Sequence, residues 1–245
     1  LNCSYADVMN ISGEELSEYL EDSYNEYEED GVMVITRSNK RANLFNQQIR
    51  TRIKWFEDEL GAGDKLMIVK NNYTWLPYDS KAGFIANGEM CELLKVIRTE
   101  ERYGLRFADA VIRLLDHPEE TELEVKMILD TLHSETTSLK DEIYSELYET
   151  VKMEYADIPV ASKRFKELRE NKYLNALQIK FGYAVTCHKA QGGQWPAVFI
   201  DQGYLTPDMI GTDHLRWLYT ALTRATDKVY LINFSSEFLS EQNDL

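Results

Sequence analysis

The sequence is poor in the residues that mark secreted, metal-binding or membrane-spanning proteins. Its 245 residues include three cysteines, at positions 3, 91 and 187, with no C-x-x-C pair and no histidine at zinc-ligand spacing. We therefore expect reduced thiols, no metal site and a cytoplasmic protein. No stretch approaches 18 uninterrupted apolar residues, and residues 1–30 lack a basic, apolar leader, so neither a membrane span nor a signal peptide is predicted.

Positive charge is also scarce. The chain has 27 lysines and arginines against 42 acidic residues, a net charge of −15. Such a balance by itself argues against a nucleic-acid ligand, because phosphates require basic partners. Residues 1–30, however, hold ten of the acids and no base, while stretches 37–54 and 163–189 gather basic residues. Charge alone therefore decides nothing about the partner.

Strands and helices alternate along much of the chain, which predicts an α/β fold. The capping-box pattern Ser12–Glu15 followed by apolar residues at helical spacing predicts an acidic amphipathic helix within residues 1–30. Ser38 is expected to cap a second helix, and a third is expected over 213–224. Buried strands are predicted at 32–36, 65–70, 178–183, 197–201 and 228–233.

A central stretch has a different pattern. Segments 90–99, 103–115 and 121–129 are of strand type, which predicts a small antiparallel sheet or barrel. Two helices, over 139–155 and from Pro159 to about residue 173, follow without an assigned function. The predicted organisation is a lead-in helix (1–30), one α/β domain (31–85 with 178–245) and an inserted domain (86–177).

The most informative segment is 184–195, AVTCHKAQGGQW. Thr186 and His188 offer hydrogen-bonding groups, Lys189 offers a charge, and two glycines follow where backbone can approach a ligand closely. A lone histidine of this kind is more often structural. The whole string, however, resembles motif V of superfamily 1 DNA helicases, T-x-H-K-x-Q-G-x-E in the RecD/Dda-like branch that includes the exodeoxyribonuclease V alpha subunit.

This resemblance implies two sets of contacts. The DNA-binding set is Thr186, His188 and Lys189, and the nucleotide-binding set is Gln191, Gly192, Gly193 and Gln194. Gln194 departs from the family pattern, which has a glutamate that contacts the nucleotide ribose. A glutamine can still accept a hydrogen bond, so an uncharged contact is expected.

A second segment, YTALTRATDK at 219–228, resembles motif VI, Y-x-A-x-T-R-A. The resemblance gives Arg224 the role of an arginine finger that reaches the γ-phosphate. A guanidinium suits this task because it stays charged and binds phosphate with a fixed fork. An isolated arginine at a helix end would more simply compensate the helix dipole, but motif V, about 30 residues upstream, favours the catalytic interpretation.

The segment ITRSNKRANLFN at 35–46 resembles motif IVa. Thr36, Arg37 and Asn39 would lie at the carboxyl end of a strand, where open α/β sheets bind ligands. The family uses this edge to hold single-stranded DNA. The alternative interpretation is a helix cap followed by solvated basic residues.

Further similarity at 63–67, 71–73 and 86–89 extends the resemblance over roughly residues 31–235. It implies a second RecA-like domain: an α/β fold with a parallel sheet, helices on both faces, and a β-rich SH3-like insertion plus two helices. Tyr73, Trp75 and Trp195 are candidates for stacking on bases.

No phosphate-binding G-x-x-x-x-G-K-[ST] and no D-E-x-[QH] motif occurs. The family carries these in an N-terminal RecA-like domain, which we expect before Leu1 in a longer protein. ATP and Mg²⁺ would be bound mainly by that domain. The expected function is the C-terminal part of an ATP-dependent DNA helicase moving 5′ to 3′, inactive alone, with recombination or repair subunits among its partners.

Two other functions compete with this hypothesis. The chain could be a degenerate helicase-fold module that binds nucleic acid or acts as an adaptor without turnover, an interpretation that Gln194 favours weakly. It could also be a nuclease, which needs clustered carboxylates around Mg²⁺. The acids of residues 1–30 are expected on one helix face without such a cluster, so the nuclease interpretation is disfavoured.

Overall fold

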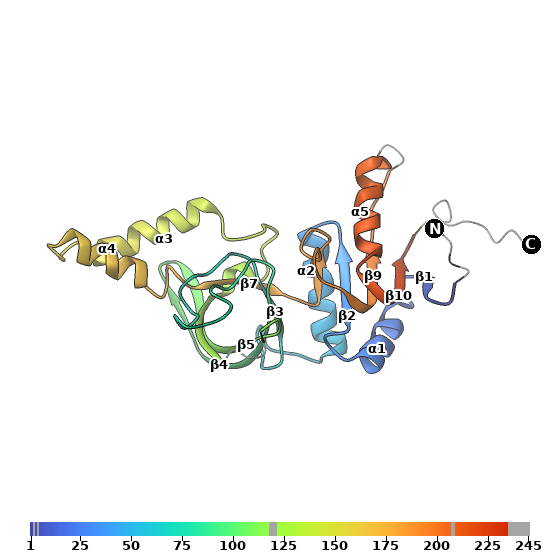
Figure 1. Ribbon diagram of the computed structural model, residues 1–245, viewed down its shortest axis with the longest axis horizontal. Helices are drawn as coiled ribbons and strands as arrows, with labels where there is room; N and C mark the ends of the chain where they lie inside the picture. Colours follow the sequence, from blue (N-terminus) through green and yellow to red (C-terminus); the bar gives the residue numbers. More distant parts are fainter. Residues whose placement is uncertain (2, 4, 118–121, 207–208, 235–245) are drawn as a thin grey trace, which may run out of the picture. The chain divides into compact units, whose positions relative to one another are not determined.

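The computed structural model describes residues 1, 3, 5–117, 122–206 and 209–234, and the chain divides into two compact units. The first unit joins Leu1–Trp55 to Tyr183–Leu245, and the second comprises Phe56–Gly182 (Figure 1). The second unit is therefore an insertion within the first. All three cysteines are free thiols, as predicted, and no described helix is long and apolar enough to cross a membrane.

The first unit is built on a five-stranded sheet with strand order β1-β10-β9-β2-β8, in which all four pairings are parallel. The strands are β1 (Val8–Ile11), β2 (Val32–Thr36), β8 (Ala184–Thr186), β9 (Trp195–Asp201) and β10 (Ala225–Ile232). The central strands β2 and β9 are buried almost throughout, as expected for a parallel sheet covered on both faces. The predicted parallel α/β sheet is confirmed.

Local sequence signals account for the first two helices. Before α1 (Leu16–Tyr27), the amide of Ser12 donates to the Glu15 carboxylate and the amide of Glu15 donates to the Ser12 hydroxyl, which is the predicted capping box. Ser38 accepts a hydrogen bond from the amide of Arg41 and caps α2 (Asn39–Gln48). Helix α2 continues into a π-helical turn, Ile49–Ile53. The helix predicted over 213–224 is α5 (Thr212–Leu222), which also belongs to the first unit.

The order of the strands determines which face each connection covers. From β1 to β2 and on to β8 the chain moves one way across the sheet, and from β8 through β9 to β10 it returns. Since parallel crossovers are right-handed, α1 and α2 cover one face while residues 187–194 and α5 cover the other. The direction reverses between β2 and β9, so the carboxyl ends of these strands form the crevice where such sheets bind ligands.

The second unit contains a closed barrel of strand order β3-β4-β5-β6-β7. Its strands are β3 (Lys65–Ile68), β4 (Met90–Arg102), β5 (Leu105–Leu114), β6 (Leu123–Ile128) and β7 (Leu177–Phe181). Only the β6–β7 pairing is parallel. The predicted β-rich insertion thus contains a small barrel, although residue 121, where its third strand was expected to begin, lies outside the described residues.

Two predictions of domain membership are wrong. The strand expected at 65–70 for the α/β domain is β3, which pairs antiparallel with β4 and β7 in the barrel. The strand expected at 178–183 corresponds mainly to β7, and the strand of the parallel sheet is the shorter β8. The boundaries therefore fall near residues 55 and 183 instead of 85 and 178. Short apolar runs look alike in a parallel sheet and in a barrel.

The lead-in segment 1–30 is also more than a helix. It begins with β1, which pairs with β10 at the edge of the sheet, and the sequence analysis missed this strand. β1 has four residues, and the polar residues on either side of it, Asp7 and Ser12, are exposed. So short a strand carries too little periodicity to be recognised without its partner strand. Residues 1–30 are therefore part of the first unit. The last stretch of the predicted domain, 235–245, lies outside the described residues.

The predicted helix pair, α3 (Asp141–Glu154) and α4 (Ala161–Glu170), packs on the outside of the barrel. Leu147, Val151 and Leu168 of the pair share one apolar cluster with Phe107 and Ile128 of the barrel. Beside this cluster the ammonium of Lys126 is fully buried and lies 2.6 Å from carboxylate oxygens of both Glu100 and Asp109. The pair therefore extends the apolar packing of the second unit beyond the barrel.

Candidate functional site at two edges of the parallel sheet

The carboxyl edge of the sheet, at the crevice between β2 and β9, carries the first group of candidate residues. Thr36 ends β2, and Asp201, its partner in register, ends β9. The guanidinium of Arg41 binds the Asp201 carboxylate through two hydrogen bonds, of 2.7 and 2.8 Å, across this crevice. This paired fork fixes the start of α2 against the end of β9.

The predicted DNA-binding residues at this edge differ in accessibility. Thr36 is fully buried, and its hydroxyl donates to the carbonyl of Ser38, so its side chain supports the turn instead of facing solvent. Arg37 is exposed, and Asn39 is half-buried at the start of α2. Thr186 ends β8 in register with Thr36, which brings these two predicted segments side by side.

Arg37 contacts two residues that sequence reasoning missed. One guanidinium nitrogen lies 3.3 Å from Nδ1 of His214, and the guanidinium carbon lies 5.5 Å from the centre of the Trp217 ring. His214 and Trp217 both belong to α5, and their rings stack, with centroids 6.1 Å apart. The only available signal was their spacing of three residues on a predicted helix, which places them on the same face.

Two buried polar atoms near this edge have unmet hydrogen-bonding capacity. Oε1 of Gln202, the residue after β9, and Nε1 of Trp217 are both buried, and neither has a hydrogen-bond partner in the described part of the chain. Buried polar groups are normally bonded, so such atoms call for a partner outside the chain or a bound water. This edge is therefore suited to a polar ligand.

Acid is expected to destabilise the first unit through His214. Burial lowers the pKa of His214, and the charge of Arg37 lowers it further. Below the unfolded-state pKa of about 6.5 the unfolded chain thus binds more protons than the folded one, so the free energy of unfolding falls as the pH falls. We expect the Tm to drop between about pH 7.5 and about pH 5.5, and to drop less in His214→Asn. Equal drops in both proteins, by calorimetry, would contradict this cause.

The segment after β8 runs from the carboxyl edge of the sheet to the amino edge. Thr186, its starting point, is in register with Thr36 and so with Asp201, the last residue of β9. Its end point, Trp195, is the first residue of β9 and pairs with Ala225, the first residue of β10. Six residues of strand separate the two edges by about 20 Å. Residues 187–194 cross this span in successive turns.

The predicted nucleotide-binding residues therefore lie at the amino edge. Gln191, Gly192 and Gln194 are exposed, and Gly193 is half-buried. Gly192 has φ = 93°, a conformation that favours glycine, whereas a Cβ on Gly193 would lie 2.3 Å from the ring of Trp195. The second glycine is thus explained by packing within the chain. The predicted stacking residue Trp195 is used for this contact.

Arg224 lies at the same edge, between α5 and β10. Its Nη1 donates to the carbonyl of Gly193 at 3.1 Å, its Nε donates to the carbonyl of Thr220, and its Nη2 donates to the hydroxyl of Thr223. The guanidinium is half-buried and lies beside the glycine pair, not in a closed core. Two of its five N–H groups have no partner in these three bonds.

Segment 187–194 and helix α5 lie side by side and are joined at both ends. Near the carboxyl edge, the thiol of Cys187 contacts the carbonyl of Trp217 at 3.5 Å. Near the amino edge, Arg224 binds Gly193. Trp217 lies about 7.5 Å of helical rise before the end of α5 at Leu222, and Arg224 follows two residues later. Trp217, which contacts Arg37, thus lies on α5, and Arg224, which contacts Gly193, follows the end of that helix.

The remaining predicted residues lie at the start of the crossing segment. His188 is exposed, and Lys189 is half-buried with a pKa that burial lowers. Their backbones are fixed by hydrogen bonds, since the amides of Lys189 and Ala190 both donate to the carbonyl of Thr186. No group of three or more His, Cys, Asp or Glu side chains among the described residues is placed to hold a metal ion.

Residues 181–232 match the family described as UvrD-like helicase C-terminal domain. No curated protein matches the chain in sequence. The Pif1 helicase from Candida albicans shares 12% identity at a TM-score of 0.44, over 86% of this chain and 47% of that one. The Pif1 helicase from Bacteroides, in complex with ADP-AlF3 and ssDNA, shares 10% identity at a TM-score of 0.42, over 86% and 43%.

The chain therefore spans less than half the length of these two solved structures. The family match is confined to β8, β9, α5 and β10 with the short segments between them, and both the crossing segment and Arg224 fall inside it. The part of this chain that joins the two edges of the sheet is thus similar to the UvrD-like helicase C-terminal domain.

Proposed function

We propose that this chain is the C-terminal part of an ATP-dependent DNA helicase or translocase. The carboxyl edge of its parallel sheet holds single-stranded DNA, and the amino edge contributes one wall of a nucleotide site. The observation that carries the proposal is the double connection between these edges. Segment 187–194 and α5 span the sheet together and are joined near both ends. A movement of Arg224 toward a nucleotide would therefore be transmitted to Trp217 and Arg37.

At the amino edge, Arg224 is the catalytic residue and acts as an arginine finger. Its position between α5 and β10, beside an exposed loop, fits a nucleotide approaching from a second domain. Gln191, Gly192 and Gln194 are exposed there and would contact the nucleotide, while the carbonyl of Gly193 holds Arg224 in place. ATP with Mg²⁺, bound mainly by an N-terminal RecA-like domain, supplies the phosphoryl chemistry.

At the carboxyl edge, Arg37 provides the positive charge for a DNA phosphate, and Thr186, His188, Lys189 and Asn39 provide further contacts. Thr36 positions the turn that presents Arg37, because its own hydroxyl is buried and bonded. The predicted stacking residue Trp75 donates its indole N–H to the carbonyl of Asn175 at 2.7 Å, so it has a structural role. The rest of the proposal follows from resemblance. It assigns the chain to the RecD/Dda-like branch, with an SH3-like barrel, 5′ to 3′ movement and recombination or repair partners.

Replacing Arg37 by alanine tests the DNA-binding edge. We expect the chain to bind an oligothymidylate about tenfold more weakly at low salt, because one phosphate contact is lost. The plot of log binding constant against log salt should become less steep by about 0.7. Fluorescence anisotropy with a labelled oligonucleotide measures both quantities.

Arg52→Ala is the matched control, since Arg52 is exposed on the π-helical turn, away from the carboxyl edge. It should leave affinity and salt dependence as in the wild type. An Arg37→Ala protein that binds like wild type would remove this edge from DNA binding.

One observation favours the adaptor function as a second candidate. Arg224 already makes three hydrogen bonds within its own unit, as a purely structural arginine would. In a degenerate module these bonds would persist in the presence of nucleotide. A longer protein that binds DNA but does not hydrolyse ATP would support this alternative.

A further inference from the structure

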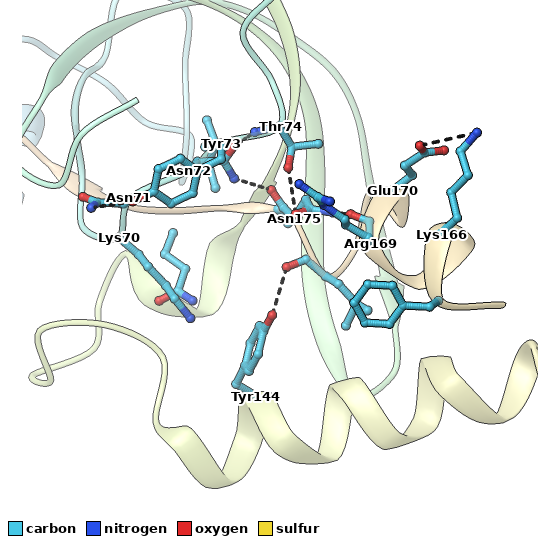
Figure 2. A pocket seen from close by; sticks show the side chains of 15 residues that line it. Lys70, Asn71, Asn72, Tyr73, Thr74, Tyr144, Lys166, Arg169, Glu170 and Asn175 are labelled. Carbon is cyan, nitrogen blue, oxygen red and sulfur yellow. Dashed lines mark hydrogen bonds and ion pairs between the residues drawn. The ribbon is translucent and has the colours of Figure 1, made fainter. Parts of the chain in front are cut away.

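A groove of about 770 Å³ lies wholly within the second unit and has no part in the site described above. One wall is the loop Lys70–Thr74 after β3, and the opposite wall is formed by α3 and α4 (Figure 2). Residues 174–176, which lead into β7, and the first two residues of β7 form its floor. The groove is thus made where the helix pair meets the barrel, and it accounts for a pair to which the sequence assigned no function.

The amides of the groove hold its walls together. Nδ2 of Asn72 donates to the carbonyl of Asn175, and Oδ1 of Asn72 accepts from the amides of Thr74 and Trp75. Oδ1 of Asn175 accepts from the hydroxyl of Thr74. These bonds join the loop to the strand that precedes β7, as Figure 2 shows for Asn72, Thr74 and Asn175. The loop is therefore pre-organised, and these amides are already used within the chain.

The charge of the groove is opposite to that of the protein. Lys70, Lys166 and Arg169 line it against a single acid, Glu170, in a chain of net charge −15. The ammonium of Lys70 lies 4.1 Å from the centre of the Tyr144 ring, which holds it at the wall. In the described part of the chain, no carboxylate forms an ion pair with Lys70 or Arg169. The ammonium of Lys166 lies 3.9 Å from the carboxylate of Glu170, which is a long contact between two exposed side chains. Such a groove attracts an anionic ligand.

Two aromatic rings face out of the same groove. Tyr73 is 72% exposed and Phe165 is 64% exposed, whereas large aromatic rings are usually well buried. Tyr73 is supported from one side by Phe84, with ring centroids 5.0 Å apart. The two rings come from opposite walls. Exposed aromatic rings interleaved with basic groups are the chemistry by which single strands are bound, with bases on the rings and phosphates on the cations.

We infer that this groove is a second binding site for single-stranded DNA, separate from the carboxyl edge of the sheet; the choice of DNA rests on the proposed function. Lys70 and Arg169 bind phosphates, and Tyr73 and Phe165 stack on bases. The alternative ligand is an acidic peptide. Nucleic acid is favoured because the amides that would bind a peptide backbone are engaged within the wall, which leaves rings and cations as the recognition groups. Binding should accordingly be tolerant of base sequence.

The test uses the full 245-residue chain with two labelled oligonucleotides of equal length, oligothymidylate and its abasic counterpart. Lys70→Gln with Arg169→Gln should weaken binding of both by about tenfold and reduce the salt slope by about 1.4. Tyr73→Ala with Phe165→Ala should weaken oligothymidylate by about tenfold or more and leave the abasic strand unchanged. Both pairs of side chains are exposed, and a Tm within the wild-type error confirms that each variant folds.

Matched controls lie just outside the groove. Lys163→Gln changes an exposed lysine on α4, the helix that carries Arg169. Tyr78→Ala changes a fully exposed tyrosine of the second unit. Both should bind like wild type.

The outcomes separate this inference from the proposed function. A wild-type chain that fails to bind oligothymidylate would overturn both. Wild-type binding that the Lys70 and Arg169 variant keeps unchanged, with the same salt slope, would overturn the groove alone. If that variant instead loses affinity for polyglutamate and keeps it for DNA, the groove is a peptide site. An equal loss on both strands in the Tyr73 and Phe165 variant would overturn stacking.

Discussion

DNA-stimulated ATP hydrolysis is expected to fall by about 10³-fold or more when Arg224 is replaced by alanine in a protein that also carries the N-terminal ATP-binding domain. The reason is that a fixed guanidinium would no longer reach the phosphate at which negative charge develops. Steady-state phosphate release at saturating oligothymidylate measures the effect. Affinity for single-stranded DNA without nucleotide should change less than about twofold, because Arg224 lies at the opposite edge of the sheet from Arg37.

Arg216→Ala is the control for this prediction, since Arg216 lies on α5, the helix that precedes Arg224, is 77% exposed and forms an ion pair with exposed Asp213. Arg224→Lys should recover little activity, because lysine keeps the charge but loses the planar fork. Arg224 also joins α5 to Gly193, so the Tm of each variant must be measured beside its activity. Hydrolysis at the wild-type rate in a folded Arg224→Ala protein would leave the arginine with a structural role alone and support the adaptor function.

The largest expected loss of stability follows from replacing Lys126 by alanine. Lys126 is fully buried between Glu100 and Asp109, which are 26% and 16% exposed. Its hydrogen bond lowers the pKa of Glu100, so removing it leaves two carboxylates close together with the exposed guanidinium of Arg98 as their remaining cation. Breaking a fully buried pair costs about 3–5 kcal/mol, and partial exposure of the acids reduces this to about 2–3 kcal/mol here. Denaturant unfolding of the chain measures the change.

Lys152→Ala provides the control, because Lys152 pairs with Glu149 on the exposed face of α3. Such surface pairs contribute little to stability, because solvent screens their charges. Adding Glu100→Gln to Lys126→Ala should recover part of the loss by removing one of the two neighbouring negative charges. A Lys126→Ala protein as stable as the Lys152→Ala protein would show that water replaces the ammonium at no cost.

Elements with strong local signals were predicted correctly. The capping box of Ser12 and Glu15, the cap at Ser38 and the helix pair over 139–173 each depend on residues within a few positions of one another. The same holds for β2 and β9, whose runs of apolar residues are long enough to indicate buried strands. Local hydrogen bonding and periodicity are encoded in neighbouring residues, so one sequence suffices to detect them.

Elements that depend on a distant partner were assigned wrongly or missed. β3 and β7 are short apolar runs, and nothing within them states whether they pair in a parallel sheet or in a barrel. β1 is defined by its pairing with β10, more than 200 residues away. Such pairings are chosen by burial and register across the whole fold, and a single sequence does not record that choice.

For the candidate site, the sequence by itself determined the residue types and their order: a polar segment ending in two glycines, an arginine after a helix, and a basic segment after a strand. The tertiary structure decided how they are grouped. Strand register places Thr36 and Thr186 at one edge and Gly193 and Arg224 at the other, and α5 adds His214 and Trp217. The physical reason is that parallel strands with right-handed connections bring the ends of distant segments together, whatever lies between them in sequence.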